Sequence, residues 1–131
     1  MKRKVLICIA MLIMFVVLCS CQRKEIILNT EESFYSEFEI NSNQVLIYCT
    51  LLVKNTTQKE CKVKFDANFD SDVEGGLLKE ADLHGYLADL KSDTFKIVKG
   101  DNWINVVFVG EFGGKEQKRN RLLPAITMSV L

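Results

Sequence analysis

The stretch from Gln44 to Lys54, QVLIYCTLLVK, predicts a strand at the centre of a β-sheet. Successive side chains of a strand point to opposite faces of the sheet. Here one face is wholly apolar and the other largely so: Val45, Ile47, Cys49, Leu51 and Val53 against Leu46, Tyr48, Thr50 and Leu52. A strand with two apolar faces must be covered on both, so we expect it between other strands and not at an edge.

Alternating stretches on either side predict its neighbours. Residues 33–40 have the two-residue period of a half-buried strand, with one face formed by Phe34, Ser36, Phe38 and Ile40. Residues 60–69 alternate in the same way and follow the central stretch after a short polar loop. The pattern therefore predicts a hairpin between the central stretch and 60–69.

Two cysteines lie on the apolar faces of this predicted hairpin, Cys49 and Cys61. They can be a pair of free thiols, because cysteine packs well as a small apolar residue. They can also form a cross-strand or inter-sheet disulfide, which would contribute about 2–4 kcal/mol. We favour the free pair, because a disulfide between adjacent strands needs a particular geometry.

The segment 70–93 is ambiguous from sequence. Leucines between 77 and 90 fit an uneven helix face, whereas 83–88 fits a short strand after a loop. Gly85 disfavours a helix by about 1 kcal/mol relative to alanine, and we favour the strand. The last third predicts three further strands at 94–98, 103–112 and 122–131. The stretch 103–112 is apolar on both faces, so we expect it to be a second central strand.

These elements predict an all-β fold. About seven short strands separated by turns every 8–12 residues are typical of a two-sheet β-sandwich. Three stretches, VLIYCTLLVKN at 45–55, Phe95-x-Ile97 and VVFVG at 106–110, resemble immunoglobulin-like domains of small Gram-positive lipoproteins of unknown function. The resemblance covers 33–131, implies a telokin-like, immunoglobulin-like sandwich and brings no catalytic residues with it.

Ahead of the predicted domain, the sequence has the layout of a secretory signal peptide. Lys2-Arg3-Lys4 precedes an apolar run of 14 residues, 5–18. A helix that spans a bilayer needs about 20 such residues. The run ends in Leu18-Cys19-Ser20-Cys21, which resembles the lipobox of bacterial lipoproteins.

That resemblance implies a lipid anchor. Cys21 would receive a diacylglycerol on its thiol, and cleavage after Ser20 would make Cys21 the mature N-terminus. The chain then divides into a signal peptide at 1–20, a lipidated N-terminus and tether at 21–32, and the sandwich at 33–131. The protein would lie on the extracytoplasmic face of a bacterial membrane. The alternative is an uncleaved signal anchor from Val5 to about Cys21.

The charge of the mature chain is close to balanced. The full chain has 17 basic and 17 acidic residues, and removal of the signal peptide leaves 14 basic and 17 acidic, a net charge of −3. Nucleic-acid-binding proteins usually carry a basic excess. The composition therefore argues against a nucleic-acid partner.

One acidic stretch resembles the start of a calcium-binding loop. Asp70, Asp72 and Glu74 occupy its first, third and fifth positions, and Gly75 occupies the sixth. Such a loop ends in a bidentate glutamate at position twelve, where this chain has Ala81. An ordinary acidic turn is the competing interpretation. No other cofactor is predicted.

Two further features bear on partners and catalysis. A basic cluster, a candidate contact for lipid headgroups or wall polymer, contains Lys115, Lys118, Arg119 and Arg121. The only histidine, His84, has no accompanying nucleophile motif, so we expect no enzyme; an envelope hydrolase using His84 is the third hypothesis. The sequence predicts a lipid-anchored, non-catalytic binding module with an envelope protein or wall ligand as partner. Its main alternative is a calcium-dependent surface protein.

Overall fold

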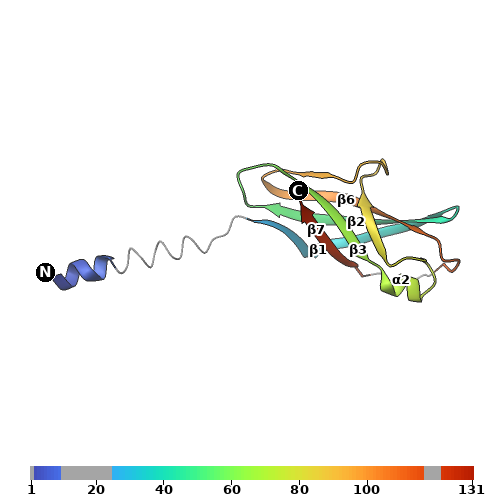
Figure 1. Ribbon diagram of the computed structural model, residues 1–131, viewed down its shortest axis with the longest axis horizontal. Coiled ribbons are helices and arrows are strands. Elements are labelled where there is room, and N and C mark those ends of the chain that lie inside the picture. The colour runs from blue at the N-terminus through green and yellow to red at the C-terminus, as the bar shows by residue number, and fades with distance from the viewer. Residues whose placement is uncertain (1, 10–24, 117–121) are drawn as a thin grey trace.

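The computed structural model describes residues 2–9, 25–116 and 122–131. Residues 2–9 form a helix, and most of the remaining described chain lies in antiparallel strands (Figure 1). The elements are β1 (Ile26–Asn41), β2 (Gln44–Asn55), β3 (Cys61–Asn68), the short helix α2 (Asp70–Glu74), β4 (Asp82–Tyr86), β5 (Phe95–Ile97), β6 (Gly100–Glu111) and β7 (Ala125–Val130). The prediction of an all-β fold is confirmed.

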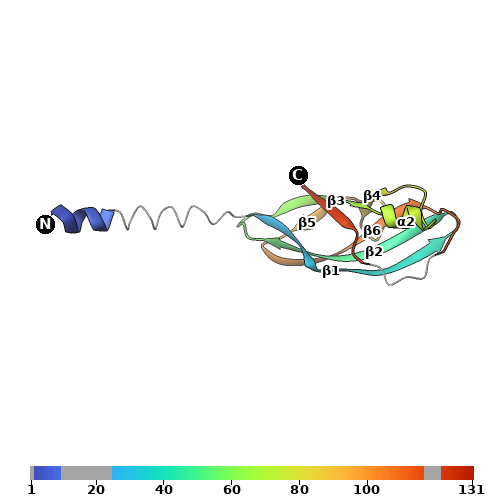
Figure 2. The same cartoon turned by 90° about the horizontal axis from the view of Figure 1, so that it is seen from below.

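The seven strands form one curled sheet. Their order is β1-β2-β6-β4-β3-β5, and β7 pairs with the other side of β3. The curl brings β3 and β5 over β1 and β2, as Figure 2 shows in the view from below. The hydrophobic core lies between these two halves, and its largest fully buried side chains include Phe65, Phe108, Ile47, Leu51 and Ile97.

The two strands predicted to be central are central. β2 pairs with β1 on one side and with β6 on the other, in continuous register from Gln44–Glu111 to Asn55–Gly100. The inward face of β2 is buried along its length. Leu46 and Leu52 are also buried although they point to the opposite face, which accounts for the two-sided apolar pattern.

The predicted hairpin between β2 and β3 is wrong. β3 pairs with β4, β5 and β7 in the opposite half of the curled sheet. The buried Asn55 side chain redirects the chain at the end of β2: its amide nitrogen donates to the Lys59 carbonyl, and its oxygen accepts from the backbone of Thr57. Alternation specifies which face of a strand is buried but not which strand lies beside it.

β1 is longer than predicted, and one side chain of its predicted apolar face, Phe34, points outward. It begins at Ile26, inside the segment predicted as tether, and residues 26–29 pair with the end of β2. Its register with β2 shifts between Tyr35 and Glu37. Because of this bulge, Phe34 lies opposite Thr50 on the outward face and is half exposed, whereas Phe38 lies opposite Ile47 and packs against the core.

The ambiguous segment contains both a helix and a strand. α2 is a helical turn of five residues, and the strand predicted near 83–88 is β4. β4 joins the two halves of the sheet, since it pairs with β3 at Asp82–His84 and with β6 at Gly85 and Tyr86. Gly85 has no side chain at this crossing, where a Cβ atom would lie 2.6 Å from Cγ1 of Val106.

Candidate functional site

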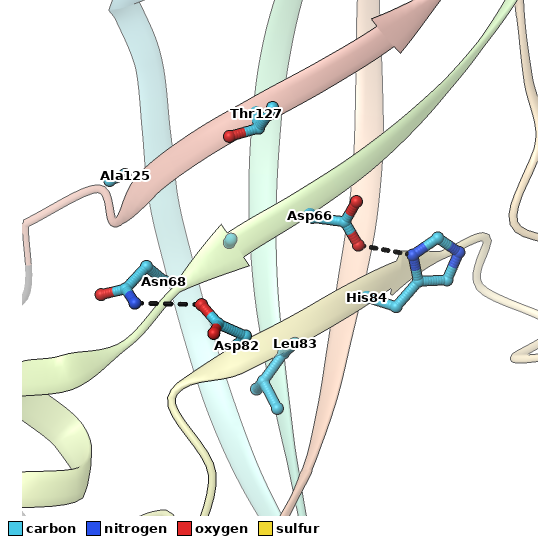
Figure 3. A pocket seen from close by; sticks show the side chains of 8 residues that line it. Asp66, Asn68, Asp82, Leu83, His84, Ala125 and Thr127 are labelled. Atoms are coloured by element: carbon cyan, nitrogen blue, oxygen red, sulfur yellow. Dashed lines mark hydrogen bonds and ion pairs between the residues drawn. The ribbon is translucent and has the colours of Figure 1, made fainter. Parts of the chain in front are cut away.

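The outer face of β4, β3 and β7 is hollowed. The hollow has a volume of about 330 Å³, and its lining residues come from neighbouring positions of the three strands: Asp66, Ala67, Asn68, Asp82, Leu83, His84, Ala125 and Thr127. Strand register explains the grouping, since Asp66 lies between His84 and Thr127, and Asn68 lies between Asp82 and Ala125. Figure 3 shows these polar side chains around one depression.

His84 is held at the edge of this hollow by two carboxylates. Its Nδ1 lies 2.7 Å from Asp66 Oδ1, and its Nε2 lies 2.7 Å from Asp93 Oδ2. Lys64 Nζ approaches the same Asp93 oxygen at 3.4 Å. The Tyr86 ring packs edge-on against the imidazole at a centroid distance of 5.2 Å. We call His84, Asp66 and Asp93 the histidine clamp.

The clamp favours the charged form of the imidazole. Its hydrogen bond to Asp66 raises the pKa of His84; partial burial opposes this rise and the bond to Asp93 adds to it. The hydrogen bond from His84 in turn lowers the pKa of the Asp93 carboxyl. An imidazolium donates from both ring nitrogens, and an ionised carboxylate only accepts. Carboxylates therefore engage both ring nitrogens, and neither nitrogen is free to bind a metal ion or a substrate proton in this arrangement.

The clamp gives stability a defined pH dependence. Because the folded pKa of His84 lies above its unfolded value of about 6.5, the stabilisation is fully present below that value. It is lost as pH rises through the folded pKa. We expect His84→Gln to lower the thermal midpoint at acidic pH and to have a smaller effect at alkaline pH.

A direct measurement is available because the chain has a single histidine. Its imidazole resonance in a nuclear magnetic resonance titration should give a midpoint above 6.5, the ordinary value. Asp66→Asn should lower that midpoint. Asp82→Asn is the matched control, because Asp82 bonds Asn68 and not His84. A wild-type midpoint at or below the ordinary value would contradict the clamp.

The hollow is suited to binding polar groups that donate hydrogen bonds. Its rim carries the carboxylates of Asp66 and Asp82, with the Asn68 amide and Thr127 hydroxyl beside them. The sequence did not predict the hollow or the histidine clamp beside it. The two clamp carboxylates, Asp66 and Asp93, are 18 and 9 residues from His84 in the sequence. The outward positions of residues 62, 64 and 66 on an alternating strand were the only available signal.

The structure does not bring the predicted calcium ligands together. Residues 70–74 form α2 instead of an open loop. Helical geometry turns the chain by about 100° per residue, so Asp72 projects away from the side shared by Asp70 and Glu74. Within residues 2–9, 25–116 and 122–131, no group of three or more His, Cys, Asp or Glu side chains is placed to hold a metal ion.

The predicted cysteine sites have different surroundings. Cys49 is buried in the core, where burial raises the pKa of its thiol to about 12. Cys61 is partly buried at the start of β3 and packs against the same core from the other half of the sheet. Both are free thiols. The predicted lipidation site, Cys21, lies outside the described residues.

The basic cluster is only partly described. Lys115 is exposed after β6, near Gly76, at the α2 end of the domain. Lys118, Arg119 and Arg121 lie outside the described residues.

Fold and site together define a β-protein with one antiparallel, curled sheet of seven strands and a polar hollow on its outer face. No family model, curated protein or solved structure matches the chain. In the described part of the chain, no helix has the length and apolar character required to cross a bilayer.

Proposed function

We propose that this protein is a lipid-anchored lipoprotein on the extracytoplasmic face of a bacterial membrane. The observation that carries this proposal is the position of the lipobox-like stretch. Leu18-Cys19-Ser20-Cys21 follows a basic start and an apolar run, and Cys21 lies only five residues before the first residue of β1. The folded domain therefore begins almost directly after the proposed acylated residue.

We propose further that the domain is an immunoglobulin-like sandwich. Immunoglobulin domains place strands A, B, E and D in one sheet and C, F and G in the other. Two long-range pairings support this assignment, since β2 pairs with β6 as B pairs with E, and β3 pairs with β7 as C pairs with F. The position of β4 beside β6 corresponds to strand D.

The domain acts as a non-catalytic binding module for an envelope protein or wall ligand. The hollow on β4, β3 and β7 supports this role, because it offers carboxylate, amide and hydroxyl groups and engages its one histidine in ion pairs. The hollow also lies towards α2, away from the end where β1 begins. An anchored domain would therefore present the hollow away from the lipid.

Replacing Cys21 by alanine tests the anchor. In cells fed alkyne-labelled palmitate, we expect label on the wild-type protein and none on Cys21→Ala, because only the Cys21 thiol would form the thioether. Cys19→Ala is the matched control and should be labelled like the wild type. External protease should digest the labelled domain in cells stripped of their wall. Unlabelled wild-type protein, or label that persists in Cys21→Ala, would refute the proposal.

A further inference from the structure

Three of the domain's exposed apolar side chains lie at one end, whereas Leu122, the most exposed of all, lies near the other. We call the first of these ends the tether end; it is the end at which β1 begins, opposite α2 (Figures 1 and 2). Ile27 and Trp103 are 45% and 55% exposed on the outward face of β1 and β6, and Val98 is 48% exposed in the turn before β6. In the strand register, β2 lies between Ile27 on β1 and Trp103 on β6, and the two residues are offset by two positions along the strands.

Hydrogen bonds join the separate segments of the tether end into one structure. The Glu25 backbone nitrogen donates to the Thr56 hydroxyl, and the Thr56 nitrogen donates to the Glu25 carbonyl. Lys99 Nζ donates to Gln58 Oε1 across the neighbouring turns. The start of the domain at Glu25 is thus bonded to the turn after β2, and that turn is bonded to the turn before β6.

The two ends of the domain differ in charge. Residue 25 and the segments 54–62 and 96–102 at the tether end carry five lysines and three acidic residues. The segments 68–82 and 110–116 at the α2 end carry two lysines and seven acidic residues. The positive end would therefore face the lipid to which Cys21 is joined.

The length of the connecting chain limits how far this end can lie from the bilayer. Ile26 is the fifth residue after Cys21, and an extended chain advances at most about 3.6 Å per residue, or roughly 18 Å over these five steps. Tryptophan favours the interface between headgroups and acyl chains. Lysines near an anionic surface contribute about 1 kcal/mol each.

We propose that the tether end docks onto an anionic lipid bilayer, with Trp103 in the headgroup region and Ile27 and Val98 beside it. The inference rests on the lipid anchor of the proposed function. Docking would hold the domain in one orientation, with the α2 end and the hollow directed away from the membrane.

Trp103 is the only tryptophan in the chain, so its fluorescence reports the contact directly. The experiment uses the full chain, expressed and processed in a bacterial host and reconstituted into vesicles. The vesicles contain phosphatidylcholine and phosphatidylglycerol in equal amounts, with or without bromine-labelled acyl chains. We expect bromine to quench most of the Trp103 emission and added salt to weaken the quenching, since salt screens the lysines. Flotation of the vesicles reports the anchor independently.

The matched control moves the reporter to the other end. Trp103→Phe combined with Leu122→Trp places the single tryptophan at an exposed position shortly before β7 begins beside Asn68, at the α2 end. Its emission should be unaffected by bromine. For charge, Lys59→Glu combined with Lys99→Glu should reduce quenching of Trp103, whereas Lys115→Glu should leave it unchanged.

The outcomes separate the two proposals. A protein that floats with unquenched Trp103 is anchored but not docked, which overturns the inference alone. Equal quenching of the reporters at both ends overturns the assignment of docking to the tether end. A protein that does not float overturns both the lipid anchor and the docking that rests on it.

Discussion

Replacing Phe108 by alanine should cost about 3–5 kcal/mol of the free energy of unfolding. Phe108 is fully buried on β6, opposite Ile47 of β2 and Gly85 of β4. Its ring packs against Phe69 with centroids 5.5 Å apart and an interplanar angle of 64°. The side chain therefore fills the core where β4 joins the two halves of the sheet. The total free energy of unfolding of a domain of this size is only about 5–15 kcal/mol, so the expected loss is a large fraction of that total.

Phe34→Ala provides the matched control. The same atoms are removed, but Phe34 is half exposed on the outward face of β1. Substitutions at such surface sites usually change stability by about 0.5 kcal/mol or less. Urea unfolding of the chain 22–131, followed by circular dichroism, measures both variants. Equal losses for Phe108→Ala and Phe34→Ala would contradict the described core.

Adding a single methyl group at Gly85 should destabilise the domain by about 1–3 kcal/mol. The new Cβ would lie 2.6 Å from Val106 Cγ1 and 3.2 Å from the Phe65 carbonyl oxygen. Replacing glycine elsewhere often stabilises by about 0.4–1 kcal/mol through the unfolded chain. Here the steric term is larger, because Val106 and Phe65 are both fully buried and have no space to move into.

Shortening the neighbour tests this cause. In a Val106→Ala background the clashing Cγ1 is gone, so Gly85→Ala should cost clearly less than it does in the wild type. Residues in contact show such non-additive effects of about 0.5–3 kcal/mol. Additive losses in the double variant would mean that Gly85 is needed for another reason. Urea unfolding of the wild type, the two single variants and the double variant gives the four free energies of this double-mutant cycle.

The sequence predicted the strands better than their partners. The two-sided apolar pattern of 44–54 and 103–112 placed β2 and β6 inside the sheet, because burial on both faces leaves no other position. The same pattern did not reveal that β2 and β3 lie in opposite halves. In the turn between them, the buried Asn55 side chain bonds to residues 57 and 59, and the partners of β3 are strands far along the sequence.

Local irregularities account for other differences. The alternation of 33–40 placed Phe34 inward, and the register shift after Tyr35 turned it outward. The acidic stretch at 70–75 matched a calcium loop by spacing, but residues 70–74 fold as a helical turn, whose geometry directs Asp72 away from Asp70 and Glu74. In the histidine clamp, the pairing of β3 with β4 brings Asp66 to His84, and Asp93 reaches His84 from the segment before β5. Composition and spacing carry no signal for either approach.

The lipid anchor is the central proposal, because the localisation and the inferred docking both depend on Cys21. Intact mass of the protein extracted from membranes tests it most directly, with wild type measured beside Cys21→Ala. We predict a wild-type mass equal to residues 21–131 plus acyl chains, and no such species for Cys21→Ala. An unmodified full-length mass for the wild type would contradict the proposal and identify 5–21 as an uncleaved anchor.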